Sequence, residues 1–119
     1  MLDTSQLEYA IVGAICIEPK ICDKISTILS PDDFSISACS EVYEAACDAL
    51  SRGKHFDAVL AADAIPNRVD DAVNFIRECM DVTPTLANTE DHARMLHQRA
   101  GESRFKLAGQ EALEGGDAA

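Results

Sequence analysis

The chain has 119 residues, which suits a single domain with one hydrophobic core. Hydrophobic residues make up 47% of it and aromatic residues only 5%, so the core must be built mainly from aliphatic side chains. The 21 acidic residues outnumber the 10 Lys and Arg and give a formal net charge of −11, which argues against nucleic-acid phosphates and anionic membranes as direct ligands, since both are bound by clustered Lys and Arg.

The first predicted element is a helix near the N-terminus. Ser5 and Glu8 have the spacing of a capping box, in which each side chain bonds a backbone amide at the start of a helix. The residues behind them are apolar on nearly all sides, which indicates a buried central helix that includes Ile11 and Ile15. Gly13 weakens helix propensity in the middle of this segment, so we expect it to permit close packing of a neighbouring helix.

A second helix and a short turn are predicted to follow. Pro19 suits the first turn of the second helix, because a proline there loses no helical hydrogen bond. Ser30 precedes Pro31 and two carboxylates, an order that is typical of a helix start. We expect a short turn that ends by burying Phe34.

The middle of the chain predicts two more helices. Residues 37–52 form the third, with Tyr43 in its apolar phase and Gly53 in the position that ends a helix. Asp57 is then expected to cap a short, Ala-rich fourth helix, which Pro66 terminates.

A fifth and a sixth helix are predicted toward the C-terminus. Phe75 falls one position off the apolar phase of the fifth helix, so its ring either lies half-exposed at the helix edge or covers a gap between the fifth and sixth helices. Asn88 is expected to cap the sixth helix, whose inner face includes Leu96. The apolar residues of the fifth helix share one helical phase and are Val69, Ala72, Val73, Ile76, Cys79 and Met80.

The helical pattern weakens after Gly101, and Gly109 with the pair at 115–116 predicts a fraying helical tail. No stretch shows the alternation of a strand. The fold class is therefore all-α, a compact bundle of about six helices whose last helix leads toward a truncated helical hairpin. We expect one domain over residues 1–105, and a fraying tail or the start of a hairpin or linker over 106–119.

No group of residues in the sequence predicts chemistry. Neighbouring carboxylates lie at or near helix starts, where negative charge is stabilised by roughly 0.3–1 kcal/mol. The Gly53-Lys54 pair lacks the first glycine and the hydroxyl of a phosphate loop. The five cysteines include no Cys-x-x-Cys pair, which argues against zinc and a disulfide framework and for a reducing compartment. We expect a cytoplasmic protein without catalytic, cofactor-binding or metal-binding residues.

The order of these features along the chain is more specific than any one of them. Over about residues 5–105 this order closely resembles the N-terminal domain of the DnaB-type bacterial replicative helicases. The segments that carry the resemblance are Ser5-x-x-Glu8, Val12-Gly13-Ala14-Ile15, Leu29-Ser30-Pro31-Asp32-Asp33-Phe34, Val42-Tyr43-Glu44-Ala45, Arg52-Gly53, Asp57, Thr83-Pro84-Thr85-x-Ala87-Asn88 and Ala93-Arg94.

The resemblance implies a helical bundle that pairs to form the collar of a hexameric ring and contacts primase and a helicase loader. In the family a RecA-like motor follows this domain, so ATP and Mg are expected to bind only there. For this chain alone we expect at most a weak dimer, no direct nucleic-acid binding and no membrane binding. The candidates for contacts with a partner are Phe75, Arg94 and Arg104.

Two other functions stay open at this point. The helicase-interacting domain of a primase is a helical bundle of similar character. A stand-alone acidic protein that mimics nucleic acid or inhibits a basic partner would also explain the net charge of −11. The order of the motifs favours a non-catalytic assembly and docking module of a replicative helicase over both, and over an enzyme.

Overall fold

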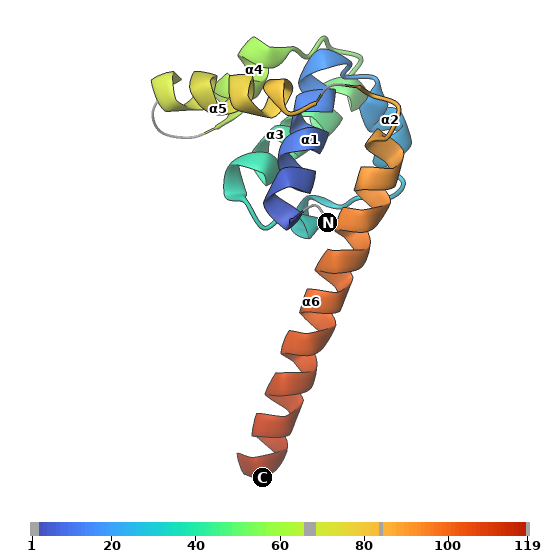
Figure 1. Cartoon of the computed structure of the whole chain (residues 1–119), viewed down its shortest axis with the longest axis vertical. Coiled ribbons are helices and arrows are strands. Elements are labelled where there is room, and N and C mark those ends of the chain that lie inside the picture. Colours follow the sequence, from blue (N-terminus) through green and yellow to red (C-terminus); the bar gives the residue numbers. More distant parts are fainter. Residues whose placement is uncertain (1–2, 66–68, 84, 119) are drawn as a thin grey trace.

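Every regular element in the part of the chain that the structure describes is a helix. The computed structural model describes residues 3–65, 69–83 and 85–118, with side chains over 3–65, 71–83 and 85–104. The elements in these ranges are α1 (Thr4–Ile17), α2 (Ile21–Ile25), the short 3-10 helix η1 (Pro31–Asp33), α3 (Ser37–Ser51), α4 (Ala58–Ala64), α5 (Val69–Asp81) and α6 (Thr89–Ala118). The all-α bundle of about six helices is confirmed. Helices α1 to α5 gather into one body, from which α6 projects (Figure 1).

Helix α1 lies at the centre of the bundle. Each of the other five α-helices packs against it. Its side chains are buried over nearly the whole helix, including Leu7, Ile11 and Ile15, none of which has exposed surface. A helix that is apolar on all sides is stable in water only when other elements surround it, as the sequence predicts.

The start of α1 differs from the prediction. The N-terminal cap is Asp3, whose carboxylate accepts a hydrogen bond from the Gln6 amide, while the Gln6 side chain accepts one from the Asp3 amide. The predicted capping box of Ser5 with Glu8 is therefore wrong. An Asp caps as well as a Ser and a Gln closes the box as well as a Glu, so the same motif forms two residues earlier.

Glu8 has a different role, because its side chain is fully buried. One carboxylate oxygen accepts a hydrogen bond from the Ser35 hydroxyl, and the other accepts one from the Ile36 amide at 2.9 Å. Ile36 is the residue that precedes the first turn of α3. Glu8 thus ties α1 to the entrance of α3.

Gly13 of α1 lies directly against the C-terminal end of α5. A methyl group at this position would overlap the Cys79 carbonyl oxygen and the Thr83 hydroxyl. The Thr83 hydroxyl in turn lies 3.1 Å from the Ala10 carbonyl oxygen and 2.8 Å from that of Cys79, so it bonds the end of α5 to α1. The prediction that Gly13 permits close packing of a neighbouring helix is confirmed.

The core is continuous and mostly aliphatic. The Phe34 ring lies over the Tyr43 ring at a centroid distance of 5.2 Å, and the Tyr43 hydroxyl donates a hydrogen bond of 2.7 Å to the Leu29 carbonyl oxygen. The six residues that the sequence places in the core are all buried, and they are Ile11, Ile15, Phe34, Tyr43, Ile76 and Leu96.

Local signals predict several helix ends correctly. Gly53 follows the cap of α3 with a φ of 68°, a left-handed conformation that glycine adopts without strain. The Asp57 carboxylate accepts a hydrogen bond from the Leu60 amide and so caps α4. Helix α6 begins at Thr89, directly after Asn88. Pro66, the predicted terminator of α4, lies outside the described residues.

Two elements depart from the sequence pattern. Pro19 lies in the turn before α2 and not in its first turn, since the helix begins at Ile21. Val73 is 41% exposed although it shares the apolar phase of α5. The buried face of α5 consists of Ala72, Ile76 and Cys79, and Val73 lies at the outer edge of this face. The side chain of Val69 lies outside the described residues.

Helix α6 continues through Gly101 to Ala118, so the weakening of the pattern after Gly101 does not mark a helix end. Whether residues 106–119 serve as a tail or as the start of a hairpin or linker stays a prediction. Within the described ranges, no helix combines the length and the apolarity that a membrane span requires.

We expect Gly13→Ala to destabilise the fold by about 1–3 kcal/mol, because the methyl group must displace the backbone of α5. Helix propensity alone would predict that Gly13→Ala stabilises the fold, because it favours Ala over Gly by about 1 kcal/mol. Gly101→Ala is the matched control, since a methyl group in α6 meets open space and should stabilise or leave the protein unchanged. Urea unfolding measures both, and equal effects of the two substitutions would contradict the close approach.

Candidate interaction surfaces

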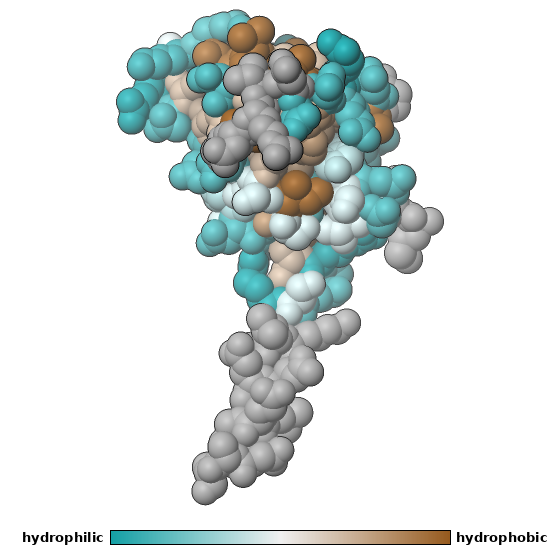
Figure 2. Space-filling model, turned by 90° about the vertical axis from the view of Figure 1, so that its left-hand side faces the viewer, coloured by the Kyte–Doolittle hydropathy of each residue, from teal (hydrophilic) through white to brown (hydrophobic). Residues whose placement is uncertain are grey.

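An open apolar groove runs between α4 and α5. It has a volume of about 490 Å³. Figure 2 views the molecule from this side and shows apolar surface toward the end of the molecule where α4 and α5 lie. The apolar residues of the lining come from both helices and include Val59, Ala62, Val73, Ile76 and Met80; Asp63, Arg77 and Asp81 add charges of both signs.

The groove coincides with most of the exposed large apolar side chains of these two helices. Val59 is 76% exposed and Val73 is 41% exposed, and both line the groove, whereas Leu60, also exposed on α4, lies outside the lining. Single exposed aliphatic residues are ordinary, whereas a contiguous apolar surface with polar residues around it is typical of a binding site. The sequence pattern did not predict this surface. Its signal is that α4 carries a large aliphatic residue, Val59, next to the side that Ala61 buries.

Phe75 lies on α5 and is partly buried. Its ring packs edge-on against the Tyr9 ring of α1, with centroids 5.3 Å apart and an angle of 89° between the planes. The ring therefore covers the seam between α5 and α1, so the alternative that it fills a gap between α5 and α6 is wrong. The expectation of a half-exposed ring at the helix edge agrees with its partial burial.

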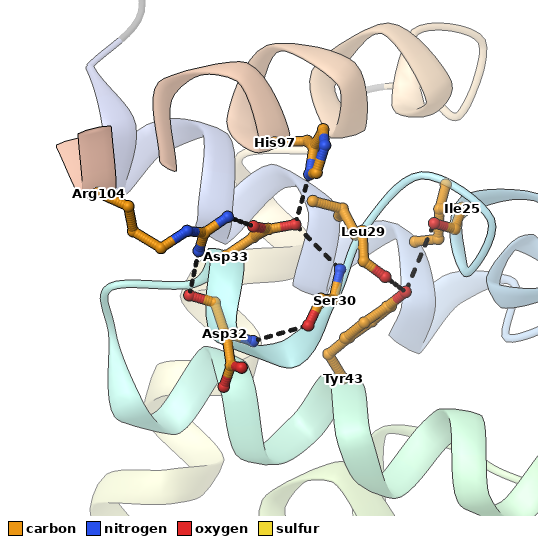
Figure 3. Close-up of polar contacts among 8 residues, drawn as sticks. All are labelled: Ile25, Leu29, Ser30, Asp32, Asp33, Tyr43, His97 and Arg104. Carbon is orange, nitrogen blue, oxygen red and sulfur yellow. Dashed lines mark hydrogen bonds and ion pairs between the residues drawn. The ribbon is translucent and has the colours of Figure 1, made fainter. Parts of the chain in front are cut away.

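A polar junction seats α6 on η1, and Asp33 is its centre (Figure 3). The Asp33 carboxylate has no exposed surface and accepts hydrogen bonds from the Ser30 amide at 3.0 Å, from His97 Nδ1 at 2.8 Å and from the Arg104 guanidinium at 2.8 Å. Arg104 also donates to the Asp32 carbonyl oxygen at 3.3 Å. The carboxylate thus caps η1 and holds two side chains of α6 at once.

The environment of Asp33 favours its charged form. Burial by itself would raise the pKa of this carboxyl group, but the hydrogen bonds from His97, the Ser30 amide and Arg104 outweigh burial and lower the pKa. A buried carboxylate with three donors is compatible with the interior because its lone pairs are satisfied. The sequence explained Asp33 as part of a helix start, which is correct, but its link to α6 joins residues 64 and 71 positions apart.

The two arginines proposed for partner contacts have intramolecular neighbours. Arg104 belongs to the Asp33 junction. Arg94 is exposed and lies 3.5 Å from the Glu90 carboxylate and 3.3 Å from that of Asp91, both on its own helix. Phe75 is on α5, which runs on a different side of the bundle from α6 (Figure 1), so the structure does not bring the three candidates together. Their role in docking stays a prediction.

We expect Asp33→Asn to destabilise the protein by about 1–3 kcal/mol at neutral pH, because Asn keeps the shape but loses the charged acceptor. Since folding lowers the pKa of Asp33, its contribution is present above about pH 4 and is lost as the pH falls through the folded-state value. The difference between wild type and variant should therefore shrink on acidification.

Urea unfolding at pH 7 and pH 3 measures this difference. Asp32→Asn is the matched control, because the Asp32 side chain is exposed and only its backbone joins the junction. A difference between wild type and Asp33→Asn that stays constant from pH 7 to pH 3 would contradict the electrostatic role.

Comparison with known proteins agrees with this architecture. The sequence profile of the family described as DnaB-like helicase N terminal domain matches residues 2–98. Replicative DNA helicase DnaB of Geobacillus stearothermophilus is 29% identical over 99 residues, and replicative DNA helicase DnaC of Bacillus subtilis (strain 168) is 25% identical over 99 residues. Each match covers 80% of this chain and 22% of the relative, so the chain spans about a fifth of the length of these proteins.

Solved structures show the same fold. The N-terminal domain of DnaB helicase from Mycobacterium tuberculosis superposes with a TM-score of 0.85 at 24% identity, over 97% of this chain and 86% of that one. The N-terminal domain of DnaB helicase from Helicobacter pylori, described together with its interactions with primase, gives a TM-score of 0.76 at 14% identity. That match covers 94% of this chain and 91% of the other.

Proposed function

The chain belongs to the DnaB-like helicase N-terminal domain family, and from this premise we propose that it is a non-catalytic assembly and docking module of a replicative DNA helicase. In this function the module associates with other copies of itself and binds the primase and the loader. ATP hydrolysis with its Mg cofactor, and DNA unwinding, belong to the motor domain of the helicase. Family membership is the reason to prefer this function over a domain of the primase itself.

The open groove between α4 and α5 is the observation that carries the docking function. Its walls are aliphatic, and Asp63, Arg77 and Asp81 supply polar contacts. This composition suits an amphipathic helix. The apolar face of such a helix packs into the groove, and polar side chains beside that face can bond the charged residues of the groove. The net charge of −11 favours a protein partner over nucleic acid.

The projection of α6 supports the assembly function. Figure 1 shows that this 30-residue helix extends well beyond the body formed by α1 to α5. Most of the stability of a helix in a protein comes from packing against other elements. A helix that extends in this way is suited to contact a second copy or a further segment of the same protein.

We expect Val73→Asp to weaken binding of the helicase-interacting domain of the primase from the same organism by about tenfold or more, because a carboxylate would be buried in the apolar interface. The matched control is Ile17→Asp at the end of α1, since Ile17 is 45% exposed and Val73 is 41% exposed. Isothermal titration calorimetry with the purified chain measures both. If both variants bind the primase with wild-type affinity, or if both lose affinity to the same extent, the groove is excluded as the docking site.

Phe75→Ala tests the remaining docking candidate on α5. Loss of the edge-on contact with Tyr9 is expected to reduce stability by about 1 kcal/mol or more. If Phe75 also contacts the primase, affinity falls by about fivefold, which corresponds to about 1 kcal/mol.

Tyr9→Ala is the control for Phe75→Ala, because it removes the same ring contact from the other side. Thermal unfolding and calorimetric titration compare the two variants. Equal losses of affinity in both would assign Phe75 a structural role only.

A further inference from the structure

Cys22 of α2 and Cys47 of α3 form a thiol pair on a part of the molecule that neither the groove nor the Asp33 junction uses. Both line a surface cavity of about 290 Å³, together with Asp23, Ser26 and Leu50. The two thiol groups lie close enough for each to perturb the ionisation of the other. Cys22 is only 2% exposed and Cys47 is partly exposed, so Cys47 is the more accessible of the two.

The two thiols differ in their ionisation. The interaction with the Cys22 thiol lowers the pKa of Cys47, against the opposing effects of burial and of the Asp23 carboxylate. The same interaction, together with burial, raises the pKa of Cys22. The two opposite pKa shifts favour the thiolate on Cys47 and the protonated thiol on Cys22. Such a pair supplies a nucleophile and a neighbouring thiol, the two parts that a reversible disulfide requires.

The other three cysteines lack this arrangement. Cys16, Cys39 and Cys79 are buried in the core, and Cys39 and Cys79 have no exposed surface. Burial raises the pKa of each thiol, to about 12 for Cys16 and Cys79. Protonated, buried thiols are inert, so these three act as small core residues.

We propose that Cys22 and Cys47 are a redox-sensitive pair, which hydrogen peroxide converts to a reversible disulfide between α2 and α3. In the first step the Cys47 thiolate attacks a peroxide oxygen: an S–O bond forms, the O–O bond breaks, and the leaving hydroxide takes up a proton to become water. In the second step the Cys22 sulfur attacks the sulfur of the Cys47 sulfenic acid. The S–S bond forms, the S–O bond breaks, and hydroxide leaves as water with the Cys22 proton.

The electrons balance in this sequence, because the two thiols lose two electrons and the peroxide gains two. A dithiol reductant reverses the reaction by thiol–disulfide exchange. The disulfide would bridge α2 and α3, and it would close the part of the chain that contains η1 and Asp33.

Peptide mapping of the purified chain by mass spectrometry tests the proposal. After treatment of the reduced chain with hydrogen peroxide, we expect a linked peptide pair that contains Cys22 and Cys47, has lost two hydrogens, and separates again with dithiothreitol. Alkylation by iodoacetamide at neutral pH should be faster at Cys47 than at Cys16 by at least about tenfold.

Variants separate the two steps. Cys47→Ser should form no disulfide, and Cys22→Ser should stop at the Cys47 sulfenic acid, which dimedone captures. Cys16→Ala is the control and should oxidise like the wild type. The proposal is overturned by oxidation of Cys47 to the sulfinic acid while Cys22 stays reduced, by a disulfide that involves a core cysteine, or by equal reactivity of Cys47 and Cys16.

Discussion

The contact between α1 and α5 at Gly13 decides where the candidate surfaces of this protein lie. Because Gly13 has no side chain, the end of α5 at Cys79 can approach the α1 backbone. The Thr83 hydroxyl, just after α5, bonds the Ala10 carbonyl oxygen of α1. One face of α5 is thereby committed to the core. Its outer edge, with Val73, then faces α4 across the open groove, because no other described element covers that edge.

Two buried carboxylates connect further pairs of elements in the bundle. Glu8 joins α1 to the entrance of α3, and Asp33 joins η1 to α6. A buried charge is costly unless donors satisfy it, so each carboxylate disfavours any arrangement that removes its partners. Within the described residues every fully buried side-chain nitrogen or oxygen has a hydrogen-bond partner. The polar contacts therefore select one arrangement of helices, while the aliphatic core provides most of the stability.

The features with functional potential occupy separate parts of the molecule. The apolar groove belongs to α4 and α5, the extended helix is α6, and the thiol pair lies between α2 and α3. A partner in the groove therefore need not displace α6, and neither Cys22 nor Cys47 lines the groove or bonds the Asp33 carboxylate. Each surface can be tested with substitutions that leave the others intact, since contributions from distant sites are additive.

The sequence by itself determined the helical class, the central position of α1 and several helix ends. Gly53 and Asp57 were predicted correctly because their caps depend on backbone groups a few residues away. Only the tertiary structure decided the partner of Glu8, the exposure of Val73 and the link from Asp33 to α6. The bonds of Glu8 and Asp33 join residues that are 27 to 71 positions apart. Val73 is exposed because no other described element covers the outer edge of α5. Periodicity states which residues share a helix face, and the packing of distant elements determines which of those faces meet water.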